Sequence, residues 1–116
     1  MAVGKLSEVV IDCRDCDLLA RFWAAVLGRT PVRDSAEWVS LTASDGATTV
    51  SFQLVPEAKV GKNLVHLDVL VDDLETAAVR CVELGATRIS ERRVDALGDF
   101  IVLCDPEGNE FCVVTG

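Results

Sequence analysis

Two short segments of the chain share one pattern, Glu8-Val9-Val10-Ile11-Asp12 and His66-Leu67-Asp68-Val69-Leu70. Both are short, apolar and interrupted by polar residues, a pattern that favours β-strands. Each is followed by acidic residues and then by a helical pattern that ends at a glycine, Gly28 or Gly85. The second stretch begins 58 residues after the first, which predicts an internal repeat.

The tails of the two copies also match, since Ser51-Phe52-Gln53-Leu54-Val55 parallels Glu110-Phe111-Cys112-Val113-Val114. Three strand-like segments are predicted between each helix and the end of its copy, with Ser44-Asp45-Gly46 as a turn. We therefore predict an α+β fold in which two βαβββ modules form a cupped eight-stranded mixed sheet, with one helix per module on the outside. The chain, residues 1–116, is predicted to be one domain, with repeats at about 6–56 and 64–115 and a linker at 57–63. The expected strands lie near Val32, at 38–41 and 48–55 in the first copy, and at 86–90, 100–104 and 109–114 in the second.

The two helical patterns carry their own start and stop signals. Asp15 is placed to cap the first helix, and Asp72 with Glu75 has the spacing of a capping box at the second. Each helix repeats apolar residues three and four positions apart, so each is expected to bury one stripe. The predicted stripes are Leu18, Leu19, Phe22 and Val26, and Leu74, Ala77, Ala78, Cys81 and Leu84.

Composition narrows the class of protein. A formal charge of -8 disfavours nucleic acid as a partner, and no apolar run approaches the roughly 20 residues that cross a bilayer. The first residues lack the pattern of a signal peptide, and the five cysteines, an odd number, lie mostly in apolar stretches, so we expect a reducing cytoplasm. Cys13-Arg14-Asp15-Cys16 has redox or zinc spacing, but without a second such motif we interpret it as coincidence.

Alternation along the strands predicts a cavity. Val9, Ile11 and Cys13 share one face of the first strand, whereas Glu8 and Asp12 share the other with Val10. The apolar faces must lie under the helices, so the mixed faces look away from them. Four polar residues at repeat-equivalent positions are then predicted to line a cleft: Glu8, Gln53, His66 and Cys112.

With these features the chain resembles the vicinal oxygen chelate superfamily, which includes glyoxalases, bleomycin-resistance proteins and extradiol dioxygenases. The resemblance spans about residues 6–115. It rests on Ala20-Arg21-Phe22-Trp23 with Leu27-Gly28, Phe52-Gln53-Leu54-Val55-Pro56, His66-Leu67-Asp68-Val69, Leu84-Gly85-Ala86 and Asp105-Pro106-Glu107-Gly108-Asn109.

The resemblance implies a divalent metal held by one residue on the first and last strand of each module. That pattern falls on Glu8, Gln53, His66 and Cys112, with Glu8 or His66 moving the proton. Cys112 departs from the usual carboxylate, and a thiolate ligand would favour zinc. Glu110, two residues away on the same face, is the alternative donor. The alternative expectation is that the protein binds no cofactor.

Each candidate residue also has a structural interpretation. His66, the only histidine, suits a ligand, a general base or a core residue bonded to backbone. Gln53 cannot titrate and is expected to orient a bound molecule. Trp38 and Ser40 are candidates for a substrate wall, although ordinary core is the simpler interpretation of Trp38. Arg93 is a candidate contact for an anionic group of the substrate.

Three functions remain open at this stage. The first is metal-assisted lyase or isomerase chemistry on a small oxygenated substrate. The second is non-catalytic binding or sequestration of a small molecule, as in bleomycin-resistance proteins, with a degenerate metal site. The third is a structural or regulatory domain with a collapsed cavity. The resemblance predicts a homodimer in each case.

Overall fold

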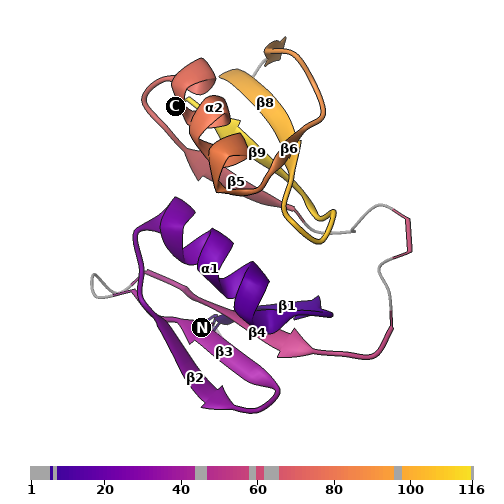
Figure 1. The fold of residues 1–116 in the computed structure, drawn as a ribbon. Coiled ribbons are helices and arrows are strands. Elements are labelled where there is room, and N and C mark those ends of the chain that lie inside the picture. Colours follow the sequence, from indigo (N-terminus) through magenta and orange to yellow (C-terminus); the bar gives the residue numbers. More distant parts are fainter. Residues whose placement is uncertain are drawn as a thin grey trace, which may run out of the picture. The chain divides into compact units, whose positions relative to one another are not determined.

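The computed structural model describes residues 6, 8–43, 47–57, 60–61, 66–95 and 98–115. They divide into two compact units, Met1–Ala58 and Lys59–Gly116, each with one helix packed on a sheet (Figure 1). The predicted turn at residues 44–46 and part of the predicted linker lie outside the described residues. Over the described ranges, no helix has the length and apolar character needed to span a membrane.

The first unit contains a four-stranded mixed sheet in the order β1-β4-β3-β2. Strand β1 (Glu8–Cys13) runs parallel to β4 (Thr49–Leu54), which pairs antiparallel with β3 (Trp38–Leu41). Strand β2 (Pro31–Ser35) forms the other edge, and helix α1 (Cys16–Leu27) connects β1 to it. This unit is a βαβββ module, as predicted.

The second unit repeats that arrangement with one difference. Strand β5 (Leu67–Leu70) runs parallel to β9 (Glu110–Val114), and β9 pairs antiparallel with β8 (Gly98–Cys104). Helix α2 (Leu74–Leu84) follows β5. The edge strand expected at 86–90 is shortened to β6 (Thr87–Arg88), and the edge continues after a break as β7 (Arg93–Asp95), which lies outside the expected range; both strands pair with β8.

A bulge causes this break. The backbone N–H groups of Ile89 and Ser90 both donate to the carbonyl oxygen of Val102, at 2.9 and 3.2 Å. Two residues therefore face one on β8, which interrupts the ladder and bends the edge strand. Pairing resumes with Arg93 opposite Phe100.

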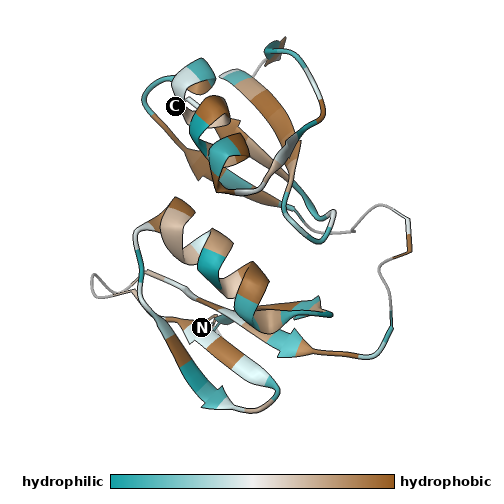
Figure 2. Ribbon diagram, viewed as in Figure 1, coloured by the Kyte–Doolittle hydropathy of each residue, from teal (hydrophilic) through white to brown (hydrophobic). Residues whose placement is uncertain are grey.

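The helix ends follow the sequence signals closely. The Asp15 side chain accepts a hydrogen bond from the N–H of Leu18, and Gly28 ends α1 in the left-handed conformation. At α2 the cap is Asp73, which accepts from the N–H of Thr76, so the prediction of Asp72 was wrong by one residue. The apolar stripe of α1 is centred on Leu19, Phe22 and Trp23, whereas Leu18 is 39% exposed. Both helices alternate apolar and polar residues around their axes (Figure 2).

The predicted separation of the sheet faces is confirmed. Helix α1 packs against β3 and β4, and α2 packs against β8, β9 and β6. Most residues of these strands that share the helix side are buried, apart from Leu54, and those of the opposite parity are largely half-buried or exposed, apart from Ser40 and Ser51. The buried apolar strand residues are Cys13, Val39, Leu41, Val50 and Phe52 in the first unit, and Ile101, Leu103, Phe111 and Val113 in the second.

The burial of Phe52 predicts a large effect of its truncation. Phe52 is fully buried, whereas Leu54, two residues along the same face of β4, is 41% exposed. We expect Phe52→Ala to lower the free energy of unfolding by about 3–5 kcal/mol and Leu54→Ala by at most about 1 kcal/mol. Urea unfolding followed by tryptophan fluorescence measures both. Equal losses would contradict this packing of α1 on β4.

Candidate functional site

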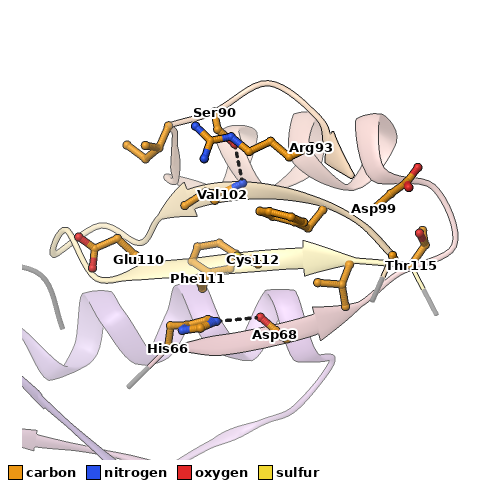
Figure 3. A pocket seen from close by; sticks show the side chains of 14 residues that line it. His66, Asp68, Ser90, Arg93, Asp99, Val102, Glu110, Phe111, Cys112 and Thr115 are labelled. Atoms are coloured by element: carbon orange, nitrogen blue, oxygen red, sulfur yellow. Dashed lines mark hydrogen bonds and ion pairs between the residues drawn. The ribbon is translucent and has the colours of Figure 1, made fainter. Parts of the chain in front are cut away.

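A hollow of about 840 Å³ lies on the second sheet, mainly on the face of its strands that looks away from α2 (Figure 3). Its lining combines an apolar floor with polar side chains at the margins. The described residues that line it are His66, Asp68, Ile89, Ser90, Arg93, Gly98, Asp99, Phe100, Val102, Glu110, Phe111, Cys112, Val114 and Thr115.

Three side chains of types that can bind metals meet at one margin of this hollow. One donor atom each of His66, Asp68 and Cys112 lies within 4.8 Å of the other two. The strand register explains this, because Asp68 on β5 stands directly opposite Cys112 on β9. His66 precedes β5 and shares the face of Asp68, and its Nε2 lies 3.3 Å from the Asp68 carboxylate.

The His66 and Asp68 side chains are 54% and 55% exposed. A pair this accessible adds little to stability, with a median of about 0–1 kcal/mol. An imidazole nitrogen, a carboxylate oxygen and a sulfur form a donor set that suits zinc. Donors around tetrahedral zinc are separated by about 3.5 Å, so modest side-chain rotation from this arrangement would suffice.

Arg93 lies at the opposite edge of the sheet. The strand order from Arg93 on β7 through β8 and β9 to β5 spans three strand spacings, or about 14 Å. Other arginines of this unit bind carboxylates: Arg80 pairs with Glu83, Arg88 with Glu75, and Arg92 with Asp99. Arg93 forms no ion pair with any residue in the described part of the chain, so its charge is available to a ligand.

Arg88 fixes the bulge that borders the hollow. Its guanidinium donates to both carboxylate oxygens of Glu75 on α2, at 2.7 and 3.1 Å, and its Nε donates to the carbonyl of Ser90 at 2.8 Å. The Ser90 hydroxyl in turn accepts from the N–H of Val102 at 3.1 Å. The hydrogen bond to Arg88 lowers the pKa of Glu75, and the same bond raises the pKa of Arg88.

The first unit has a smaller hollow of about 590 Å³. Glu8, Trp38 and Ser40 are among its lining residues. Glu8 Oε1 is shielded from solvent and has no hydrogen-bond partner among the described residues. The Ser51 hydroxyl donates to Ser40 at 3.2 Å, and the Ser40 hydroxyl donates to Asp34. The remaining lining residues are Val32, Asp34, Ser35, Thr42 and Thr49.

The strand register revises the repeat equivalence inferred from the sequence. Asp12, rather than Glu8, stands opposite Gln53, just as Asp68 stands opposite Cys112. Glu8 faces Thr49, four residues before Gln53, or about 13 Å along the strand. The register thus brings His66 and Cys112 together with Asp68, but it does not place Glu8 on the same rung as Gln53.

Asp68 is the site residue that the predicted set lacked. The sequence could have identified it, because alternation along His66, Leu67 and Asp68 places His66 and Asp68 on one face of the strand. The connection from strand to helix is longer in the second unit, running from Val69 to the cap Asp73 rather than from Cys13 to the cap Asp15. An alignment anchored on the helices therefore shifts the strands by two residues.

Comparisons with known proteins agree with this architecture. The glyoxalase-like domain family matches residues 8–114. A glyoxalase/bleomycin resistance/dioxygenase family enzyme from Burkholderia phytofirmans PsJN has a similar structure, with a TM-score of 0.83 and 23% identity over 97% of this chain and 98% of that one. No curated protein matches the chain.

Two further solved structures are similar over nearly the whole chain. The fosfomycin resistance protein FosX from Mesorhizobium loti has a TM-score of 0.76 and 22% identity, covering 100% of this chain and 94% of that one. A glyoxalase-related enzyme from Fulvimarina pelagi has a TM-score of 0.78 and 16% identity, covering 98% and 89%. At these identities the likeness establishes the fold.

The serine chain of the first unit predicts unequal effects of two similar substitutions. Ser40→Ala removes the acceptor of the fully buried Ser51 hydroxyl and the donor to Asp34, whereas Ser51→Ala removes one hydrogen bond. We expect losses in unfolding free energy of about 2–3 kcal/mol for Ser40→Ala and about 1 kcal/mol for Ser51→Ala. Urea denaturation measures the difference, and a reversed order would contradict the assigned network.

The lowered pKa of Glu75 predicts a pH-dependent contribution to stability. A carboxylate with a depressed pKa in the folded state stabilises the fold above its unfolded pKa, and this contribution is lost as pH falls through the folded pKa. Glu75→Gln should therefore lower the melting temperature at pH 7 and have less effect at pH 3. Glu83→Gln, on the same helix, is the matched control. A Glu75→Gln effect independent of pH would contradict the role of Arg88.

Proposed function

The chain belongs to the glyoxalase-like domain family, and we propose that it binds a small oxygenated molecule beside a divalent metal in the hollow of its second sheet. One observation carries the proposal, namely the convergence of His66, Asp68 and Cys112 donors within 4.8 Å at the margin of that hollow. The family context supports it, since similar structures include a fosfomycin resistance protein.

Zinc is the ion that this donor set favours. His66 would supply an imidazole nitrogen, Asp68 a carboxylate oxygen and Cys112 a thiolate, and the softness of sulfur disfavours magnesium. A zinc ion with three protein ligands keeps an open position, where it acts as a Lewis acid toward substrate oxygens. The reaction class that follows is a lyase or isomerase reaction that moves a proton next to a polarised oxygen.

The side chains that line the hollow indicate which kind of ligand it would bind. Phe100, Val102 and Val114 supply an apolar floor between the metal-ligating margin and Arg93. The Arg93 guanidinium, which forms no ion pair within the described ranges, favours an anionic substituent at that end of the ligand. We therefore propose a ligand with an apolar body, an anionic group toward Arg93 and oxygen atoms toward His66, Asp68 and Cys112.

The remaining predicted residues have proposed roles of their own. Glu8 remains a proposed acid–base residue, and its Oε1, which is buried without a hydrogen-bond partner among the described residues, supports a task beyond folding. Trp38, Ser40 and Gln53 remain proposed contacts of a ligand. A cytoplasmic location and a homodimer remain predictions from the sequence and the family.

A second function, metal-free binding, is favoured by a different observation. His66 Nε2 already contacts one carboxylate oxygen of Asp68, at 3.3 Å, without an ion between them. In that case the hollow would bind its ligand without catalysing a reaction, and the His66 imidazole would form a hydrogen bond with the ligand. Metal binding distinguishes the two functions directly.

Calorimetric titration of the chelator-treated protein with Zn²⁺ tests the proposal. We expect one zinc per chain, and an affinity more than about 100-fold lower in His66→Ala, Asp68→Ala and Cys112→Ser, because loss of outer contacts alone costs about 10–100-fold. Cys104→Ser, on the neighbouring strand and outside the donor cluster, is the matched control and should bind like the wild type.

The contrary outcomes separate the two functions. Zinc binding that is unchanged in all three ligand variants would overturn the assignment of the site. A protein that binds no zinc, yet melts at higher temperature with small aromatic carboxylates and loses this shift in Arg93→Gln, would favour the metal-free binder.

A further inference from the structure

Two cysteines lie side by side where the first strand meets the first helix. Cys13 is the last residue of β1 and Cys16 is the first residue of α1. Their Sγ atoms are 2.9 Å apart, although the sequence spacing alone was interpreted as coincidence. We propose that Cys13 and Cys16 form a redox-active dithiol that converts reversibly into an intramolecular disulfide.

The separation of the sulfurs is the first argument. A disulfide bond is about 2.05 Å long, so the two sulfurs need to approach by less than about 1 Å. Both residues are buried, with 2% and 5% exposure, between β4 and the first turn of α1. The Sγ of Cys13 lies 3.5 Å from the carbonyl oxygen of Gln53, and that of Cys16 lies 3.6 Å from the carbonyl oxygen of Phe52. Neighbouring carbonyls of one strand therefore hold both thiols.

The fold, and not only the short spacing, sets this geometry. The Asp15 side chain caps α1 at Leu18, and its backbone carbonyl accepts from the N–H of Leu19 at 3.1 Å. Parallel pairing holds Cys13 against Leu54 on β4. The helix cap and the β1–β4 pairing fix the residues on either side of the connection between β1 and α1. The two sulfurs therefore meet with little further loss of conformational entropy. An unfolded chain must order that connection first.

Thiol–disulfide exchange with a low-molecular-weight disulfide provides a balanced reaction. One thiolate attacks a sulfur of the disulfide, forming a mixed disulfide and releasing the first small thiolate. The second thiolate then attacks the protein sulfur of the mixed disulfide and releases the second small thiolate. Two electrons pass to the small disulfide, and the two protons of the dithiol end on the released thiols or in solvent.

Access for the oxidant runs through the connection between strand and helix. Arg14 and Asp15 are both exposed and cover the two cysteines with only a short segment of chain. Local opening of such a segment costs far less than global unfolding, so the buried pair remains reachable.

The test uses the full chain with Cys81, Cys104 and Cys112 replaced by serine, so that only the pair remains. This protein is equilibrated in mixtures of reduced and oxidised glutathione, quenched with acid and weighed by mass spectrometry. We expect a species lighter by about 2 Da, the mass of two hydrogen atoms. Its equilibrium constant should be about tenfold or more above that of the same protein in urea.

Single substitutions within this background complete the test. Cys13→Ser and Cys16→Ser should give only the glutathione adduct and never the lighter species. Should the triple variant fail to fold, peptide mapping of alkylated wild-type protein identifies the bonded cysteines instead. A pair that oxidises no more readily when folded than in urea, or a disulfide that joins other cysteines, would overturn the proposal.

Discussion

The need to cover one face of each sheet with a helix is the constraint on which the structure depends. Phe52 and Leu41 lie under α1, and Phe111 and Leu103 lie under α2, all essentially inaccessible to solvent. Because side chains alternate along a strand, this burial sends the neighbouring residues to the opposite face. The polar residues considered for function therefore gather on those opposite faces, and both hollows lie there.

Features that depend on neighbouring residues could be predicted from the sequence. The strand alternation, the cap at Asp15 and the closure at Gly28 each follow from a few adjacent residues, and the structure contains all three. Strand register depends on the lengths of connections, which a sequence pattern does not reveal. A shift by an even number of residues keeps every side chain on its face, so the alternation around Glu8 gives no sign that Asp12, four residues later, is the residue opposite Gln53.

The bulge after β6 is likewise not revealed by the sequence pattern, and it affects where Arg93 lies relative to the hollow. No local signal distinguishes one continuous edge strand at 86–90 from the two short strands that form. The bulge depends on both Ile89 and Ser90 bonding to Val102 and on the Arg88 contact with Ser90. Pairing then resumes at Arg93, on the same face as Cys112, so an irregularity of the edge strand places the cation at the hollow.

The residues that stabilise the fold and those proposed to bind a ligand therefore lie on different faces of the same strands. On β9, Phe111 and Val113 are buried against α2, whereas Cys112 between them faces the hollow. His66 and Asp68 contribute little to folding, because more than half of each side chain is exposed to solvent. Three side chains of types that can bind metals nevertheless converge there, which is the observation behind the proposed metal site. Cys13 and Cys16 differ in this respect, because their sulfurs lie on the buried side, where the packing that stabilises the first unit also brings them together.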